Sequence, residues 1–119
     1  MPCVDLLSVL GQETDLDGFA KTFFETAKLP KYEERKSTSH VGGYYFRAEH
    51  GEFKFTVSMS DEVDHRDLSY WIQVTNRILE AEDLVGFVDQ LARNVMLPVG
   101  FRVARVIDLG KKNEQRIDY

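Results

Sequence analysis

Hydrophobic and polar residues alternate along the middle of the chain. Every second residue from Phe53 to Met59 is hydrophobic, and the residues between them are polar. A period of two predicts a β-strand over 52–60 with one buried face. Similar patterns predict strands over 44–49 and 68–76, and His50-Gly51 supplies a tight turn between the first two strands. We expect the three strands to form an antiparallel meander.

Hydrophobic residues recur at three- and four-residue spacing in two flanking segments, which predicts two amphipathic helices. The first helix is expected over 16–28, behind a candidate N-cap at Thr14 or Asp15, and Pro30 ends it. The second helix is expected over 80–96, and its acidic first turn suits the positive end of the helix dipole.

The remaining segments have weaker patterns. A last strand is expected over 101–109, where a slip in the hydrophobic pattern indicates either a bulge or burial on both faces. The hydrophobic run 4–10, closed by Gly11, fits either a helical turn or a brief strand. We expect an exposed loop over 31–41 and a loose polar tail over 111–119.

The order helix, three strands, helix, strand predicts an α+β fold, in which an antiparallel β-meander packs with two main helices as a two-layer sandwich. The chain of 119 residues is long enough for one domain with a core and too short for two. We therefore expect a single domain over 1–119.

The charge balance narrows the choice of partner. The formal net charge is −5, whereas contacts with nucleic acid phosphates need clustered Lys and Arg. We expect no direct contact with nucleic acid. An acidic surface suits a basic protein partner, although mild acidity also serves solubility alone.

The number of cysteines and the N-terminal sequence indicate the cellular compartment in which the protein is expected. Cys3 is the only cysteine, which rules out an intramolecular disulfide and a cysteine-based zinc site and fits a reducing cytoplasm. The N-terminus lacks the basic region and apolar run of a signal peptide, and no stretch approaches the roughly 18 apolar residues of a transmembrane helix. We expect a cytoplasmic protein that is not attached to a membrane.

No arrangement of residues typical of catalysis stands out. The three histidines lie in separate loops or turns, and no Ser or Cys occupies a nucleophile elbow. Gly42-Gly43 precedes a strand and lacks the Lys-Ser/Thr pair of a phosphate loop. We expect no enzymatic activity, no cofactor and no tightly bound metal.

The loop 60–67 concentrates charge. It holds the four carboxylates of Asp61, Glu62, Asp64 and Asp67, together with His65. Three interpretations stay open: a solvated hairpin loop, an acidic patch that binds a protein, or a site for a hard cation. The spacing does not match an EF-hand, so a cation site would use Asp61, Asp64, His65 and Asp67 in another geometry.

Trp71 points to the opposite side of its strand from Tyr70 and Ile72. If that face is open, Trp71 is a candidate anchor for a partner, because Trp is enriched in interface hot spots. If a helix covers the face, Trp71 belongs to the core. The aromatic residues of the first two predicted strands resemble an RNA-stacking sheet, but the scarcity of neighbouring Lys and Arg favours a place in the core.

An ordered set of short features covers the first half of the chain: Leu10-Gly11, a helix around 19–27, Leu29-Pro30, Tyr45-Phe46, and Gly51 followed by Phe53 and Phe55. This layout resembles the small immunity proteins of bacterial polymorphic toxin systems, including those of contact-dependent growth inhibition. The resemblance implies a cytoplasmic protein without catalytic residues. It also implies that the protein binds one toxin domain, often a nuclease with a basic cleft, and blocks its active site or substrate surface.

These observations together predict a toxin-binding surface. We expect it to contain Asp61, Glu62, Asp64 and Asp67, with Trp71 as an apolar anchor if it is exposed. A second acidic group joins this surface if the third predicted strand leads back past the same edge; it consists of Glu80, Glu82 and Asp83. The alternative is a chaperone of the type III secretion class, an obligate dimer that binds an unfolded effector segment. An immunity protein is expected to be a monomer or a weak dimer when free.

Overall fold

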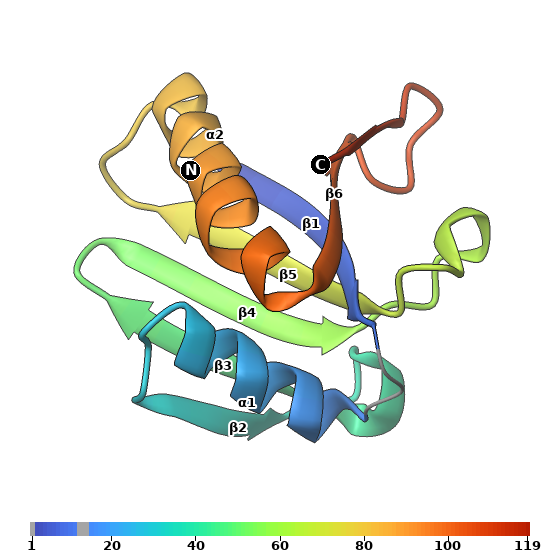
Figure 1. The fold of residues 1–119 in the computed structure, drawn as a ribbon. Coiled ribbons are helices and arrows are strands. Elements are labelled where there is room, and N and C mark those ends of the chain that lie inside the picture. The colour runs from blue at the N-terminus through green and yellow to red at the C-terminus, as the bar shows by residue number, and fades with distance from the viewer. Residues whose placement is uncertain (1, 12–14) are drawn as a thin grey trace.

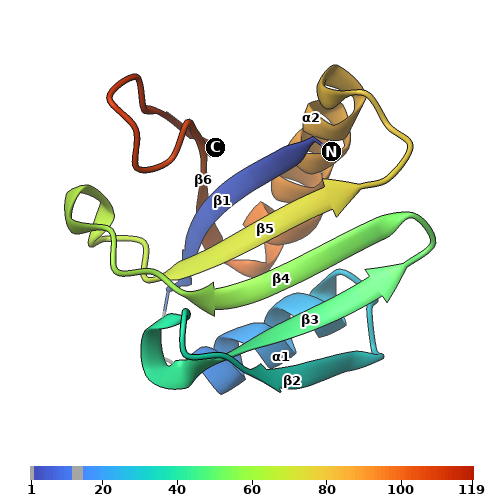
Figure 2. The same cartoon turned by 180° about the vertical axis from the view of Figure 1, so that it is seen from behind.

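The structure is a computed structural model that describes residues 2–11 and 15–119 (Figure 1). The described residues form, in chain order, β1 (Cys3–Leu10), α1 (Leu16–Thr26), β2 (Tyr32–Lys36), β3 (Tyr44–His50), β4 (Phe53–Met59), β5 (Tyr70–Asn76), α2 (Ala81–Gln90), β6 (Phe101–Ile107) and β7 (Gln115–Asp118). The seven strands of this part of the chain make one antiparallel sheet in the order β2-β3-β4-β5-β1-β6-β7. Helices α1 and α2 lie on one face of it (Figures 1 and 2), which confirms the expected α+β fold.

The first predicted helix is present as α1. The Asp15 carboxylate accepts the backbone N–H of Gly18 at 2.8 Å and so caps the helix. Thr14, the other candidate cap, lies outside the described residues. The hydrophobic stripe of the helix packs into the core, where its fully buried aromatic side chains are Phe19, Phe23 and Phe24.

The second predicted helix begins as α2 and continues as a π-helical segment, Leu91–Met96, and a short 3-10 turn, Leu97–Val99. Gly100 then turns the chain with a φ of 109°, a conformation that suits glycine. This helix packs over β1 and β5, while α1 packs over β4. None of the helices in the described part of the chain has the length and apolar character needed to cross a membrane.

The predicted meander is present as β3-β4-β5. Strand β6 pairs with β1 in a continuous register without a bulge. Phe101 and Val103 of β6 join the core under the helices, whereas Ala104 and Val106 belong to a smaller hydrophobic cluster on the other face. The slip in the hydrophobic pattern of this strand therefore reflects burial on both faces.

Three strands lie where the sequence predicts no strand or leaves the structure open. The run 4–10 is β1, a central strand between β5 and β6, and its Leu6 and Leu7 are both fully buried. The prediction of a loop over 31–41 is wrong for β2, a charged edge strand that pairs with β3. The prediction of a loose tail over 111–119 is wrong for β7, which pairs with β6. Charged edge strands discourage pairing with other chains, but they lack the alternation that signals a strand.

Candidate binding cleft on the open sheet face

The face of the sheet opposite α1 and α2 carries a cleft. Figure 2 shows this face toward the viewer, with the loops 37–43 and 60–69 at the same end of the sheet. Both loops contribute to a cleft of about 540 Å³. Its lining includes Asp5, Trp71 and Gln73 from the sheet, His40 from the first loop, and Asp61 and Glu62 from the second. The cleft therefore brings together segments that are far apart in the sequence.

Trp71 lies on the sheet side of this cleft and is half-buried. Its indole Nε1–H donates to Oδ1 of Asp5 at 2.9 Å, and the Nε2–H of Gln73 donates to the same oxygen at 3.4 Å. The two helices lie on the other face, so Trp71 is not a residue of the main core. It packs at the border of the smaller cluster formed by Leu7, Leu68, Ala104 and Val106.

The charged side chains that line the cleft in the described structure are all acidic. Asp5, Asp61 and Glu62 contribute carboxylates, and no Lys or Arg is found among the described lining residues. Within the described chain, neither Asp61 nor Glu62 forms an ion pair with a basic side chain. Carboxylates near a protein surface that are not neutralised attract cations more strongly than they would in bulk water. The cleft is consequently suited to a positively charged guest.

The wall opposite loop 60–69 is formed by the loop 37–43. The His40 ring stacks on Tyr45 with the ring centroids 4.3 Å apart, and its Nδ1 is buried without a hydrogen-bond partner in the described structure. Gly42 adopts a φ of 79°, and a Cβ there would lie 3.4 Å from Sδ of Met59. The stacking holds His40 against β3, and glycine at position 42 allows the positive φ that the turn of this loop requires.

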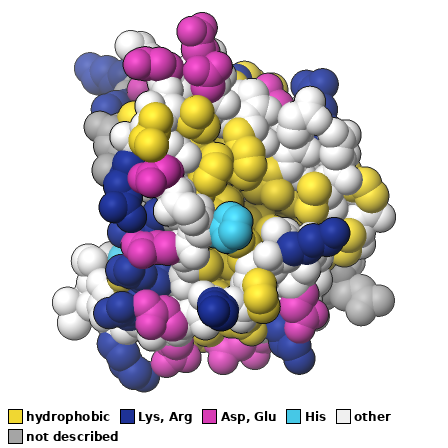
Figure 3. Space-filling view, turned by 90° about the vertical axis from the view of Figure 1, so that its left-hand side faces the viewer, with side chains coloured by type: hydrophobic (Ala, Val, Ile, Leu, Met, Phe, Trp, Pro, Cys, Tyr) yellow, Lys and Arg dark blue, Asp and Glu magenta, His cyan; other side chains and the backbone are white. Residues whose placement is uncertain are grey.

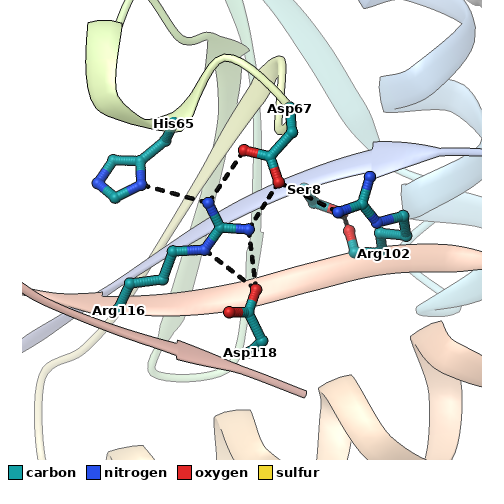
Figure 4. Close-up of polar contacts among 6 residues, drawn as sticks. All are labelled: Ser8, His65, Asp67, Arg102, Arg116 and Asp118. Atoms are coloured by element: carbon teal, nitrogen blue, oxygen red, sulfur yellow. Dashed lines mark hydrogen bonds and ion pairs between the residues drawn. The ribbon is translucent and has the colours of Figure 1, made fainter.

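Asp67, a predicted binding residue, forms ion pairs with two arginines of the same chain (Figure 4). The Arg116 guanidinium donates to its two carboxylate oxygens at 3.0 and 2.7 Å, and Arg102 donates at 3.1 Å. The hydrogen bonds from Arg116 lower the pKa of Asp67 to about 2. Arg116 lies on β7, so its bonds to Asp67 tie this strand to the loop 60–69, and Asp118 of the same strand accepts from the guanidinium at 2.9 Å. Asp67 is therefore a structural residue of this loop, unlike Asp61 and Glu62.

His65 is also occupied by internal contacts. Its ring is buried, with Nε2 at 2.9 Å from Oε2 of Glu114 and Nδ1 at 3.5 Å from Nη1 of Arg116. The Gly110 backbone N–H, and then His65, hold the pKa of Glu114 below its usual range. In the described residues, no group of three or more His, Cys, Asp or Glu is placed to hold a metal ion. This geometry does not support the interpretation of the loop as a cation site.

The second acidic group lies elsewhere. Glu80 precedes α2, and Glu82 and Asp83 lie in its first turn, after the end of β5. The loop 60–69 precedes the start of the same strand, and a seven-residue strand is roughly 20 Å long. The strand therefore separates these three carboxylates from the cleft. Asp64 is exposed in the loop but is not one of the described lining residues.

Sequence reasoning therefore identifies part of the cleft, namely Trp71, Asp61 and Glu62. It misses Asp5, Gln73 and His40, because their positions depend on strand pairings between distant segments. One sequence signal was present for Gln73, which shares the Trp71 face of its strand through the two-residue period.

A second surface feature is apolar. Figure 3 shows hydrophobic side chains gathered across the side of the molecule on the left of Figure 1, with charged side chains along one edge. Phe53 of β4 stacks on Phe87 of α2 with a centroid distance of 4.2 Å. Beside it, Phe53, Ile78 and Leu79 line a shallow hollow of about 360 Å³, and Ile78 is 71% exposed. Nothing in the chemistry of this hollow favours one kind of occupant.

Comparisons with known proteins add no relative. No protein-family model matches the chain, and no curated protein or solved structure shows significant similarity to it. The functional argument therefore rests on the geometry and charge of the cleft.

Proposed function

We propose that this protein is a cytoplasmic immunity protein, which binds and neutralises a toxin domain with a basic surface through the cleft of its open sheet face. The observation that carries the proposal is a half-buried tryptophan beside carboxylates that have no basic partner among the described residues. Trp71 supplies the aromatic surface, while Asp61 and Glu62 supply charge that the described chain does not neutralise.

The physical roles of these residues differ. Tryptophan contributes a large contact area at interfaces, and the bond to Asp5 holds Trp71 in one orientation before binding, which limits the entropy lost on association. Exposed carboxylates such as Asp64 mainly accelerate encounter with a basic partner. Those that become buried against a partner Arg or Lys set the dissociation rate, and truncating one costs about 2–5 kcal/mol of binding energy.

The resemblance of the first half of the chain to immunity proteins supports the same proposal. An acidic inhibitor is complementary to a toxin that binds nucleic acid, because such a toxin presents a basic cleft. We propose binding, without enzymatic activity or a cofactor, since the buried His65 is held between Glu114 and Arg116 and the His40 ring is held by stacking.

Cell survival tests the proposal. The genes next to this one are searched for a toxin domain, which is then expressed in cells with and without the protein, and the wild-type protein is expected to restore growth. The double variant Asp61→Lys/Glu62→Lys is expected to lose protection. Glu82→Lys/Asp83→Lys, which changes the net charge equally at the far end of β5, is the matched control and is expected to protect. Death of cells that contain the wild-type protein would contradict the proposed function. Equal protection by both variants would show that the toxin binds outside the cleft.

A further inference from the structure

We infer that the cleft is a receptor for a single arginine side chain of the partner, whose guanidinium lies against the Trp71 indole and is ion-paired by Asp61 and Glu62. The inference rests on the proposed function, because it assumes that the cleft is where the partner binds. It goes further by naming the chemical group that the cleft recognises.

The composition of the cleft matches the two parts of an arginine side chain. Its lining combines apolar surface from Trp71, Met59 and Val41 with the carboxylates of Asp61 and Glu62. Arginine has an aliphatic stem that packs on apolar surface and a planar charged end. A volume of about 540 Å³ lies within the usual range of sites that enclose small organic groups.

The indole of Trp71 is held in place beside the cleft. Because its Nε1–H is bound to Asp5, the ring is held in one orientation beside the cleft. Guanidinium groups stack on aromatic rings and are weakly hydrated, whereas the lysine ammonium is a compact, strongly hydrated charge. An aromatic side chain in the lining of the cleft therefore favours arginine over lysine.

The carboxylates are positioned to complete the contact. Oδ1 of Asp5 already accepts from Trp71 and Gln73, while its Oδ2 has no hydrogen-bond partner within the described chain. Asp61 and Glu62 add two charges, and neither is ion-paired with a basic side chain in the described part of the chain. In the same loop, Asp67 forms ion pairs with Arg116 and Arg102. The carboxylates of this loop therefore differ, because only some of them are used in contacts within the protein. A guanidinium, with five donors in a planar fork, can use several acceptors at once.

Small probes test the inference without the toxin. Trp71 is the only tryptophan, so the protein has a single indole N–H resonance in a ¹H–¹⁵N correlation spectrum. We expect Nα-acetyl-arginine amide to shift this resonance saturably, with a Kd on the order of 1 mM for a ligand of this size. Nα-acetyl-lysine amide is expected to bind several-fold more weakly. Nα-acetyl-citrulline amide, which has nearly the same shape but no charge, is expected to cause no saturable shift.

Matched variants locate the site. Asp61→Asn/Glu62→Gln is expected to weaken arginine amide binding roughly ten-fold through the loss of two ion pairs. Glu82→Gln/Asp83→Asn, which removes two carboxylates from the first turn of α2 beyond the far end of β5, is expected to leave the affinity unchanged. The same spectra show whether each variant is folded.

Several results would overturn the inference: no saturable shift with arginine amide, an equal response to lysine or citrulline amide, or equal affinity in the Asp61→Asn/Glu62→Gln variant. If these occur while cell protection still depends on Asp61 and Glu62, the arginine receptor is wrong and the proposed function stands. If arginine amide binds as expected but the wild-type protein does not protect cells, the immunity function is wrong and the receptor stands.

Discussion

The indole N–H of Trp71 donates to the carboxylate of Asp5 at 2.9 Å, which joins two residues that are 66 positions apart in the sequence. They lie on the adjacent strands β5 and β1, where the register places Asp5 opposite Gln73. The contact is therefore a diagonal cross-strand pair that fixes the aromatic ring on the open face of the sheet. The geometry of the cleft depends on this pair, and its energetic contribution can be measured.

Replacement of Asp5 by Ala is expected to lower the free energy of unfolding by about 1–2 kcal/mol, because the half-buried indole N–H loses its acceptor. Asp5→Asn keeps an amide oxygen that can accept the same bond, so a smaller loss is expected. Urea unfolding followed by Trp71 fluorescence compares the two variants. Equal stability of Asp5→Ala and the wild type would show that the bond adds nothing to the fold.

The contribution of Asp67 to stability is expected to depend on pH. Its pKa is lowered from the ordinary 3.8 to about 2 by Arg116, so the ion pair stabilises the folded state above pH 4 and loses this effect as the pH falls toward 2. The Asp67 side chain is 41% exposed, and solvent screening reduces the expected contribution to on the order of 1 kcal/mol.

The test of this prediction is the difference in unfolding free energy between the wild type and Asp67→Asn, measured between pH 6 and pH 2. The difference is expected to shrink on acidification. Asp64→Asn is the control, because Asp64 lies in the same loop and forms no ion pair within residues 2–11 and 15–119, and it is expected to show a small difference throughout. A difference for Asp67→Asn that stays constant with pH would contradict the assignment of the ion pair.

A separate prediction concerns the hydrophobic core under the helices. Phe23 is fully buried and forms edge contacts with Phe24 and Phe101. Replacing it with Ala is expected to reduce stability by about 3–5 kcal/mol, the usual effect of deleting a buried aromatic ring. A denaturation midpoint equal to that of the wild type would show that this side chain is not part of the core.

Removal of residues 115–119 tests the role of β7. The truncation deletes a paired strand and the guanidinium of Arg116, and it exposes the edge of β6. We expect lower stability and faster amide hydrogen exchange in β6, with little change in β3, which lies on the far side of the sheet. Unchanged exchange in β6 would mean that β7 does not protect it.

The sequence predicted the elements whose burial has a clear period. Both helices and the meander repeat hydrophobic residues at the spacing of their structure, so local patterns are sufficient there. The prediction failed for β2 and β7, because their residues are mostly polar and a partner strand holds them in place. The run at β1 stayed open because a short strand buried on both faces has no alternation.

Prediction of the candidate site from the sequence was limited in the same way, because local patterns do not reveal contacts between distant segments. Trp71 stood out because it interrupts the polar face of an alternating strand, and Asp61 and Glu62 because they lie in a charged loop. Asp5 and His40 could not be placed beside them, since this needs the pairing of β1 with β5 and the position of the loop 37–43. Likewise, the sequence could not show that Arg116 and Arg102 occupy Asp67.

The most direct test of the binding surface is hydrogen exchange of the protein bound to a catalytically inactive form of the toxin domain that the survival test identifies. Amides in the loops 38–43 and 60–64, which border the cleft, are expected to exchange more slowly in the complex than in the free protein. Protection confined to the apolar hollow at Phe53, Ile78 and Leu79, with unchanged exchange in both loops, would contradict the assignment of the cleft as the binding site.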